Sequence, residues 1–290
     1  MTWQPHILTT EEVVEHGPVD ALAALFDDST LRPGPGDALP PLWHWVALPR
    51  WTDSSEVGPD GHPRRGSFLP PVEFPRRMFA GGEVVLHSPV VVGSTVRRES
   101  IVASVTEKSG RSGPMVVVVV ETSLYDQGGA LLVEERQDII YRVAGARATE
   151  VAVPRDIAPT GTPLLRTDPW EAALATDPVT LMRFSAATAN AHRIHYDWPY
   201  ATMVEGYPGL VVHGPFMTLA LAQLVRIEQP DTTVRRLTHR NRQPLFCGQP
   251  AFLRCLGGDD LHHFLALVPG NAAGPDHASI LTSLDVELAR

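Results

Sequence analysis

Hydrophobic and polar positions follow the same order in the two halves of the chain, a helix and then a series of strands. Apolar residues recur at helical spacing from residue 8 to residue 27, which predicts a first helix over that range. After residue 82 short apolar runs are separated by glycine-containing turns. This pattern predicts four strands, at Glu83–Val92, Thr95–Lys108, Met115–Tyr125 and Leu131–Arg142. The intervening segment, 32–75, is rich in Pro, Gly, Trp and His, and an ordered loop is expected there.

The second half repeats this order. Pro178–Thr188 and Pro215–Val225 are predicted helices, and the second of them is almost wholly apolar. Strands are predicted at Val234–Leu245, Pro250–Gly257, Asp260–Pro269 and Ser279–Glu287. A Pro-, Thr- and Arg-rich segment, 144–168, separates the two halves. We therefore predict an α+β protein with two related domains, residues 1–150 and 165–290.

Composition narrows the classes of function. The net charge of −9, with scattered arginines, argues against a nucleic-acid partner. The longest apolar stretches reach about 12 residues, too short to cross a bilayer, and the first residues lack a secretion signal. Cys247 and Cys255 lack the spacing of a zinc ribbon and are expected to be buried, reduced thiols. These features predict a cytoplasmic protein without a membrane partner.

Residues suited to acid–base chemistry are concentrated in one block, Phe184–Ala201. It contains six polar side chains within eight positions: Asn190, His192, Arg193, His195, Tyr196 and Asp197. Shortly after it, His213-Gly214-Pro215 opens the apolar helix, whose first N–H groups have no partners inside the helix. Such a helix start presents donors and a positive dipole end that can stabilise an oxyanion on a thioester carbonyl.

The block resembles the signature of the MaoC-like, R-specific enoyl-CoA hydratases, in which an Asp lies five positions before the catalytic His. His195 matches that His, and Asn190 falls where the Asp is expected. Gly214 matches a glycine whose N–H is implied to bind the thioester oxygen. The resemblance implies a double hotdog fold, with two antiparallel sheets each wrapping a central helix. It also implies an N-terminal substrate-binding domain and a C-terminal catalytic domain.

Further motifs bring the resemblance closer to the mesaconyl-C4-CoA and itaconyl-CoA hydratase group, to which the hydroxyacyl-thioester dehydratases type 2 are related. These motifs are Gly61-His62-Pro63, Phe68–Pro71, Pro75–Gly82 and Glu134–Arg142. The group implies a hydro-lyase that adds water reversibly to a short, carboxylated enoyl-CoA and gives citramalyl-CoA. It also implies no cofactor beyond the CoA of the substrate.

The departure at position 190 changes the expected mechanism, because an amide cannot accept the proton of water as a carboxylate can. We expect His195 to act as general base, Asn190 to orient the water and the Gly214 N–H to bind the oxyanion. The expected substrate-binding residues are Arg76, Arg77, His192, Arg193 and His213. The arginines among them suit a distal carboxylate. His239, Arg240 and Arg242 form a candidate surface cluster for the phosphates of CoA.

Several alternatives stay open. They are a 3-hydroxyacyl-thioester dehydratase of the fatty-acid type, a hotdog thioesterase, and a non-catalytic acyl-thioester-binding protein that has lost its catalytic Asp. No metal site is predicted, because the His-x-x-His spacing of His192 and His195 has no fixed third ligand. Two fused hotdogs can mimic the usual hotdog dimer within one chain, so both a monomer and a homodimer fit the sequence.

Overall fold

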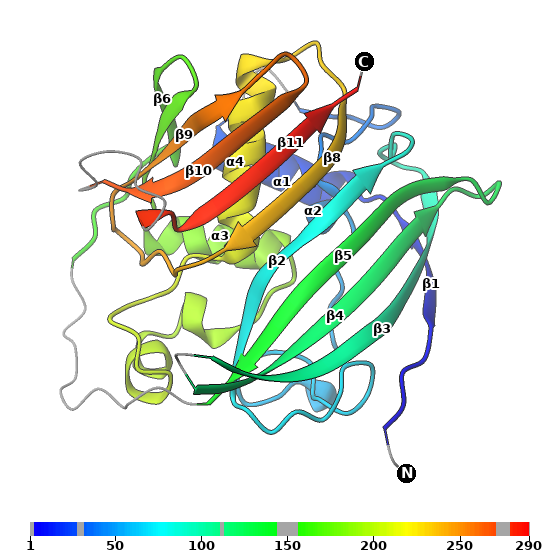
Figure 1. Ribbon diagram of the computed structural model, residues 1–290, viewed down its shortest axis with the longest axis vertical. Helices are drawn as coiled ribbons and strands as arrows, with labels where there is room; N and C mark the ends of the chain where they lie inside the picture. Colours follow the sequence, from blue (N-terminus) through cyan, green and yellow to red (C-terminus); the bar gives the residue numbers. More distant parts are fainter. Residues whose placement is uncertain (1–2, 28–31, 111–112, 144–155, 271–278, 290) are drawn as a thin grey trace.

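A computed structural model describes residues 3–27, 32–110, 113–143, 156–270 and 279–289. Its strands form one antiparallel sheet of eleven, in the order β1-β3-β4-β5-β2-β8-β11-β10-β9-β7-β6 (Figure 1). The strands of the N-terminal half are β1 (Leu8–Val13), β2 (Arg76–Leu86), β3 (Thr95–Gly110), β4 (Gly113–Tyr125) and β5 (Leu131–Arg142). Those of the C-terminal half are β6 (Leu164–Asp168), β7 (Glu171–Leu174), β8 (Val234–Asn241), β9 (Ala251–Gly258), β10 (His262–Pro269) and β11 (Thr282–Leu288).

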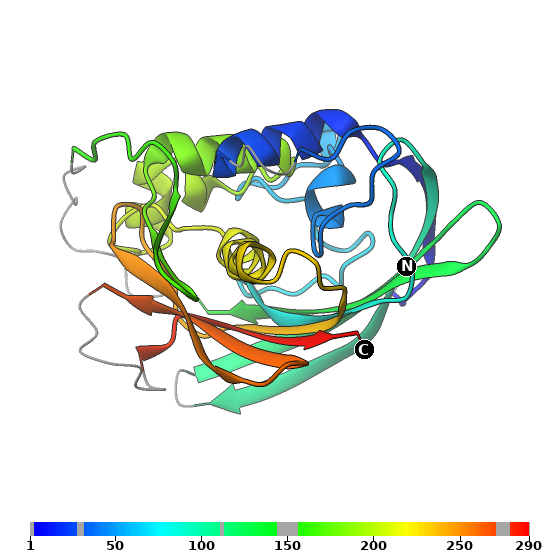
Figure 2. The ribbon, with the colours of Figure 1, turned by 90° about the horizontal axis from the view of Figure 1, so that it is seen from above.

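The helices lie on one face of this sheet in two layers (Figure 2). They are α1 (His16–Phe26), α2 (His44–Ala47), α3 (Pro178–Ala187) and α4 (Gly214–Glu228). Short helical turns occur at Ser54–Glu56, Arg193–His195 and Tyr200–Val204. None of the helices in the described parts of the chain has the length and apolar character that a membrane span requires.

The apolar helix α4 lies between the sheet and the outer helices α1 and α3 (Figure 2). Its Phe216 ring stacks on Phe26 of α1 at 5.6 Å and packs against Phe184 of α3 at 5.1 Å. Because α4 is covered on both sides, nearly all of its apolar side chains are buried, as its composition predicts. The position of its first residue, Gly214, is therefore set by packing from three directions.

The two halves meet along the pair of strands β2 and β8. Residues Gly81–Val85 pair antiparallel with Arg236–Arg240, so the two predicted sheets form one continuous sheet. The neighbouring strands β5 and β8 approach β2 closely here. A Cβ atom on Gly81 would lie 2.5 Å from the His239 carbonyl oxygen, and one on Gly82 would lie 2.0 Å from the Arg136 carbonyl oxygen. Glycine is therefore required inside this strand, where another residue would push its neighbours away.

The N-terminal half has no counterpart of α4 among the described residues, which corrects the expectation of a central helix in each half. The four-residue helix α2 and the coil around it cover that half of the sheet instead. Leu42, Trp43 and Val46 enter the main core, and Phe68 and Phe74 pack against a second core on β3, β4 and β5. The proline-rich segment is thus an ordered loop, as predicted.

Three other predictions require correction. The first predicted helix is the strand β1, paired with β3, followed by α1, because residues 8–13 alternate with a period of two and not with the helical period. The strand β2 begins seven residues earlier than predicted and ends six residues earlier, since Gly81 and Gly82 lie within it. The hairpin of β6 and β7 was not predicted as two strands. Residues 144–155 of the predicted boundary segment lie outside the described residues, and the division into two domains stays a prediction.

The close approach at β2 yields a stability prediction. Replacing Gly82 with Ala should lower the free energy of unfolding by about 1–3 kcal/mol, because the added methyl group forces β2 away from β5. Gly17→Ala in α1 is the matched control, since its methyl group would meet no atom within 4 Å and should change stability by at most about 1 kcal/mol. Denaturant unfolding of both variants measures the difference. Equal stability of the two would contradict the assigned packing.

Candidate active site

A cavity of about 1220 Å³ lies between the two halves of the protein. The N-terminal half contributes α2, the segment 50–69, β2 and β5 to its walls. The C-terminal half contributes the block that follows α3, the start of α4 and the end of β8. The block singled out in the sequence therefore faces residues of the other half across a shared space.

Positive charge dominates the ionisable side chains of this cavity. Seven arginines line it: Arg50, Arg64, Arg76, Arg77, Arg98, Arg142 and Arg242. Among the described residues that line it, the acidic one is Glu135, which accepts hydrogen bonds from Trp45 and Gln137 and pairs with His44. A chain with a net charge of −9 thus encloses a cationic cavity, which suits an anionic ligand.

His195 is held in the tautomer that a general base requires. It is 6% exposed, and its Nδ1 lies 2.7 Å from the Val211 carbonyl oxygen. A carbonyl can only accept, so Nδ1 donates and Nε2 keeps its lone pair. Burial lowers the pKa of His195 to about 3. The hydrogen bond to Val211 raises the pKa but offsets only part of this effect. The ring is therefore neutral and able to accept a proton throughout the physiological range.

His213 lies behind His195 and does not line the cavity, contrary to its predicted contact with substrate. The two rings stack with their centroids 3.5 Å apart, and Ser185 Oγ lies 2.8 Å from His213 Nε2. Burial and the neighbouring His195 lower the pKa of His213, so its ring is neutral as well. His213 supports the plane of His195 from behind.

The turn after α3 carries Asn190 and His192 to the cavity wall. Ala189 adopts a left-handed conformation (φ 53°), which ends the helix and reverses the chain. Asn190 Oδ1 then accepts a hydrogen bond from the His192 backbone N–H at 3.0 Å, which leaves its amide nitrogen as the group free to donate. Both residues line the cavity. The geometry agrees with an orienting role for Asn190, which stays a prediction.

The start of α4 brings unpaired donors to the cavity. Gly214 lines the cavity at the first turn of the helix. A Cβ atom on it would lie 3.1 Å from Asn241 Nδ2 and 3.2 Å from Phe79, so a larger residue would press against both side chains. Asn241 accepts from the Thr282 hydroxyl through Oδ1, and its buried Nδ2 has no hydrogen-bond partner. Asn241 was not predicted from the sequence, because a lone Asn near the end of a strand has no distinguishing pattern.

The two arginines at the start of β2 differ in their partners. Arg76 lies 3.2 Å from Glu205 and over the ring of Tyr207, so its charge is already balanced. Arg77 lines the cavity, is partly buried and makes no ion pair or side-chain hydrogen bond with any described residue. Burial lowers the pKa of Arg77 but leaves it charged. Of the two, Arg77 has the free cation.

Arg193, the third predicted arginine, does not line the cavity. Its guanidinium bonds to Asp197 at 2.7 and 2.9 Å, lies over the ring of Tyr200 and donates to the Pro59 carbonyl oxygen at 3.0 Å. Its side chain is fully engaged in tying the block to the N-terminal half. The structure therefore gives no support to the predicted contact of Arg193 with substrate, and Asp197 serves as its structural acceptor.

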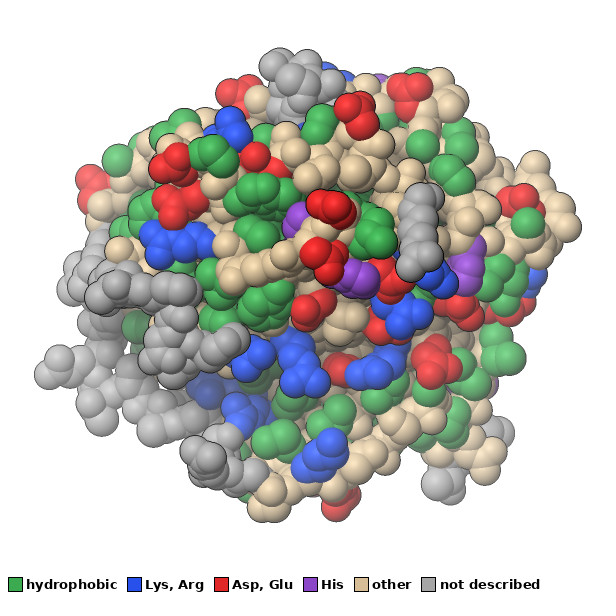
Figure 3. Space-filling view, turned by 45° about the horizontal axis from the view of Figure 1, so that its top comes forward, with side chains coloured by type: hydrophobic (Ala, Val, Ile, Leu, Met, Phe, Trp, Pro, Cys, Tyr) green, Lys and Arg blue, Asp and Glu red, His purple; other side chains and the backbone are tan. Residues whose placement is uncertain are grey.

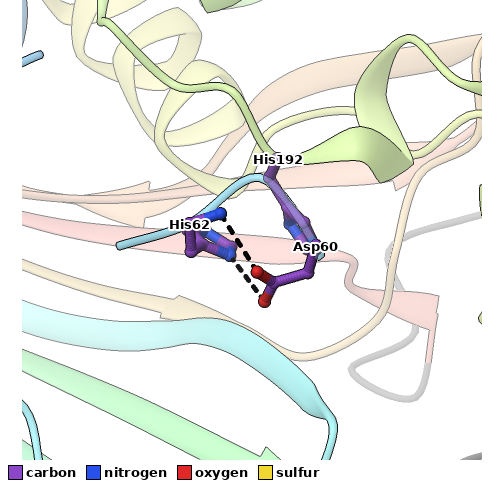
Figure 4. Close-up of side chains that lie close together, drawn as sticks. All are labelled: Asp60, His62 and His192. Atoms are coloured by element: carbon purple, nitrogen blue, oxygen red, sulfur yellow. Dashed lines mark hydrogen bonds and ion pairs between the residues drawn. The ribbon is translucent and has the colours of Figure 1, made fainter. Parts of the chain in front are cut away.

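Opposite the block, the loop of Gly61-His62-Pro63 contributes two polar residues that were not assigned a role from the sequence. Figure 4 shows Asp60, His62 and His192 pointing toward one another from the two halves. Asp60 Oδ2 lies 3.2 Å from His62 Nδ1, and the rings of His62 and His192 are 4.1 Å apart. The ligand atoms of these three residues all lie within 4.8 Å of one another, close enough for a metal ion to be considered.

The predicted CoA cluster is divided by the alternation of β8. His239 is 1% exposed, packs between the rings of Trp45 and Phe79, and has no partner for either ring nitrogen. Arg240 is exposed, on the side of β8 opposite to the buried His239. Figure 3 shows that basic side chains gather on one part of the molecular surface. Of the three predicted residues, only Arg242 lines the cavity. His239 is thus part of the packing below the site.

Comparison with known proteins identifies the family. A family model described as hydroxyacyl-thioester dehydratase type 2 matches residues 42–247. A mesaconyl-C4-CoA hydratase of Chloroflexus aurantiacus is 41% identical over 290 residues, which cover 99% of this chain and 98% of the relative. The chain belongs to the hydroxyacyl-thioester dehydratase type 2 family. The prediction of a MaoC-like hydro-lyase is thereby confirmed.

Solved structures agree with the predicted fold of this family member. A MaoC-like dehydratase of Phytophthora capsici has a TM-score of 0.68 at 14% identity, covering 99% of this chain and 96% of that one. A protein of Mycobacterium tuberculosis described as a double hotdog has a TM-score of 0.56 at 15% identity, covering 99% and 96%. At these identities the likeness shows the fold, and the predicted double hotdog is confirmed.

The position of His239 yields a prediction on stability and pH. Burial lowers the pKa of His239 to about 4, whereas the unfolded chain titrates near 6.5. The stability that depends on its neutral form is therefore present above pH 6.5 and lost as the pH falls toward 4. Between pH 7.5 and 5.5 this loss amounts to about 1 kcal/mol.

His239→Leu should remove that part of the pH dependence, because leucine fills the space between Trp45 and Phe79 without a proton to bind. Urea unfolding at pH 7.5 and pH 5.5 gives the loss for each protein. The variant should lose about 1 kcal/mol less than the wild type. Identical losses would show that His239 does not titrate on unfolding.

Proposed function

We propose that this protein adds water reversibly to the double bond of a short enoyl-CoA with a distal carboxylate, mesaconyl-C4-CoA or itaconyl-CoA, and forms citramalyl-CoA. The observation that carries the proposal is Arg77, a cation without an ion-pair partner among the described residues, beside the histidines of the cavity. A guanidinium binds a carboxylate through two parallel hydrogen bonds. The other cavity arginines suit the phosphates of CoA, and the 41% identity to a mesaconyl-C4-CoA hydratase supports the same substrate.

The mechanism follows from the protonation state of His195. Its Nε2 accepts a proton from water while the water oxygen bonds to the β-carbon. The electron pair of the double bond moves toward the thioester carbonyl, and the enolate oxygen accepts a hydrogen bond from the Gly214 N–H. The His195 imidazolium then returns the proton to the α-carbon, which restores the neutral ring. Dehydration follows the same steps in reverse.

The neighbouring groups support this sequence of steps. The unpaired Nδ2 of Asn241 lies beside Gly214, so two donors converge where the enolate charge develops. Asn190 presents its amide nitrogen and can orient the water or the substrate but cannot take the proton. We propose that the reaction needs no cofactor beyond the CoA of the substrate. The cytoplasmic location and the homodimer stay predictions.

A 3-hydroxyacyl-thioester dehydratase of the fatty-acid type is the second candidate. The observation that favours it is the size of the cavity, about 1220 Å³, which exceeds the space that a four- or five-carbon acyl group fills. An apolar acyl chain would leave Arg77 without a counter-charge, and burying an unpaired cation costs free energy. This is why we favour the carboxylated substrate.

The reaction itself is tested with a panel of thioesters. Mesaconyl-C4-CoA and itaconyl-CoA should lose their enoyl-thioester absorbance with the wild-type protein, and His195→Gln should lower kcat by about 10²–10⁴-fold. His262→Gln, on the exposed end of β10, is the control and should retain full activity. Release of free thiol in place of hydration would indicate a thioesterase. Binding without turnover, unchanged in His195→Gln, would indicate a non-catalytic protein.

Substrate selectivity is tested at Arg77. Arg77→Gln should raise KM for mesaconyl-C4-CoA by about 10–100-fold, because a charge-assisted hydrogen bond to the carboxylate contributes about 1.5–3 kcal/mol. Crotonyl-CoA, which has no carboxylate, should be affected by less than about threefold. Arg193→Gln is the matched control and should alter both substrates in the same proportion. Equal losses on both substrates in Arg77→Gln would contradict the assigned role.

A further inference from the structure

The replacement of the expected Asp by Asn190 leaves the attacking water with one fewer acceptor. A water molecule that bonds to carbon through its oxygen directs its two hydrogens at two acceptors, and His195 Nε2 supplies one of them. Asn190 is a weak candidate for the second, because its Oδ1 is uncharged and already accepts a hydrogen bond from the His192 backbone N–H. A stronger second acceptor would come from another part of the cavity wall.

His62 has the chemistry of that acceptor. Burial raises the pKa of Asp60, but the hydrogen bonds from His62 and the charge of Arg65 outweigh it and lower the pKa, so Asp60 is a carboxylate. It accepts from His62 Nδ1 at 3.2 Å, so the lone pair of His62 lies on Nε2. Burial and the charge of Arg77 lower the pKa of His62 to about 4 and keep the ring neutral. The side chain is 19% exposed and lines the cavity.

The loop that carries His62 is fixed against the block. Arg193 donates its backbone N–H to the Asp60 carbonyl oxygen at 2.9 Å and its guanidinium to the Pro59 carbonyl oxygen. Gly61 has a positive φ of 91°, and a Cβ atom on it would lie 1.8 Å from the Ala191 carbonyl oxygen. The glycine of the Gly-His-Pro motif thus permits a contact between backbones that holds His62 in place.

The charge of the pair also matches that of the missing residue. A carboxylate at position 190 would carry one negative charge and would stabilise the His195 imidazolium. Asp60 and neutral His62 together carry one negative charge, and the rings of His62, His192 and His195 follow one another at 4.1 and 5.5 Å. The negative charge is thus restored beside the block from the other half of the protein.

We infer that His62, positioned by Asp60, accepts the second hydrogen of the attacking water in place of the carboxylate absent at position 190. The inference rests on the proposed hydration. One hydrogen of water passes to His195 Nε2 and then to the α-carbon, and the hydrogen held by His62 remains on the oxygen as the new hydroxyl. The sum of these steps is one water added across the double bond. In this scheme His62 is a catalytic residue, and Asp60 and Arg193 are positioning residues.

A metal ion on Asp60, His62 and His192 is the competing reading of the same cluster. The surrounding charges disfavour it, because Arg65 lies 4.0 Å from Asp60 and the charge of Arg77 acts on both histidines. A divalent cation would have to be held against two guanidinium groups. Those groups favour an anionic substrate at the same place.

The test combines loss and rescue. His62→Leu should lower kcat on mesaconyl-C4-CoA by about 10²-fold with KM changed by less than about threefold. Asn190→Asp in the His62→Leu background should recover at least about tenfold of that loss, because it returns an acceptor with a negative charge to the other side of the water. The same substitution in the wild type should give no such gain, since the acceptor is already present. A residue with a merely structural role would not be rescued from position 190.

Two further variants keep the test decisive if His62→Leu folds poorly. His62→Gln retains an acceptor and should keep more activity than His62→Leu, and Asp60→Asn should lower kcat by about tenfold. Full kcat in His62→Leu, or a loss that Asn190→Asp does not rescue, would overturn the inference while wild-type hydration still stands. Activity lost to a chelator and restored by Zn²⁺ would also overturn it, in favour of the metal. The proposed function fails separately, if the wild type hydrates no thioester of the panel.

Discussion

The pairing of β2 with β8 is the contact on which the site depends. Through it, Gly81–Val85 of one half bonds to Arg236–Arg240 of the other. This pairing brings the N-terminal end of β2 to face α4. Arg77 lies four residues before this contact and Asn241 one residue after it. The free cation and the unpaired amide are therefore placed on two neighbouring strands at the cavity by a single backbone register. A shift of one residue would turn Arg77 to the other face of the sheet.

A second constraint is that the described residues of the N-terminal half contain no counterpart of α4. A helix like α4 over β3, β4 and β5 would fill the space that the cavity occupies. The short α2 and the coil around it leave this space open and bring Trp45, Arg50 and His62 to its walls. The two halves thus contribute different parts of the cavity. In the proposed reaction, one supplies the buried helix whose first N–H groups would bind the thioester oxygen, and the other supplies charge and room for the acyl-CoA.

The sequence allowed some parts of this arrangement to be predicted and not others. The strands β3, β4 and β5 and the helices α3 and α4 were predicted within a few residues, because their apolar periodicity is long and regular. The strand β2 was misplaced because paired glycines ordinarily mark turns, whereas here they permit close strands. Position 195 could be recognised from spacing within one block. The contact of the His62 loop with that block could not, because Pro59 and Arg193, which bond to each other, are 134 residues apart and carry no local signal of contact.

Arg193 and Arg77 illustrate the same difference between local and distant information. Their side chains are chemically identical, and each lies in a motif of the family resemblance. One is neutralised by Asp197 four residues away, a partner that the sequence shows. Arg77 is distinguished by having no ion-pair partner among the described residues. This can be recognised only from the folded structure, because it depends on every element around the side chain.

That unpaired charge also helps to keep two of the histidines, His62 and His192, neutral. Burial alone lowers the pKa of an imidazole, and the field of Arg77 adds to this effect at His62 and His192. Protonating either of these rings would place it beside the like charge of Arg77. In the proposed reaction, a substrate carboxylate at Arg77 would offset that charge at His62 and His192, the second of which contacts His195. A substrate that lacks the carboxylate should therefore lose part of its rate as well as part of its affinity.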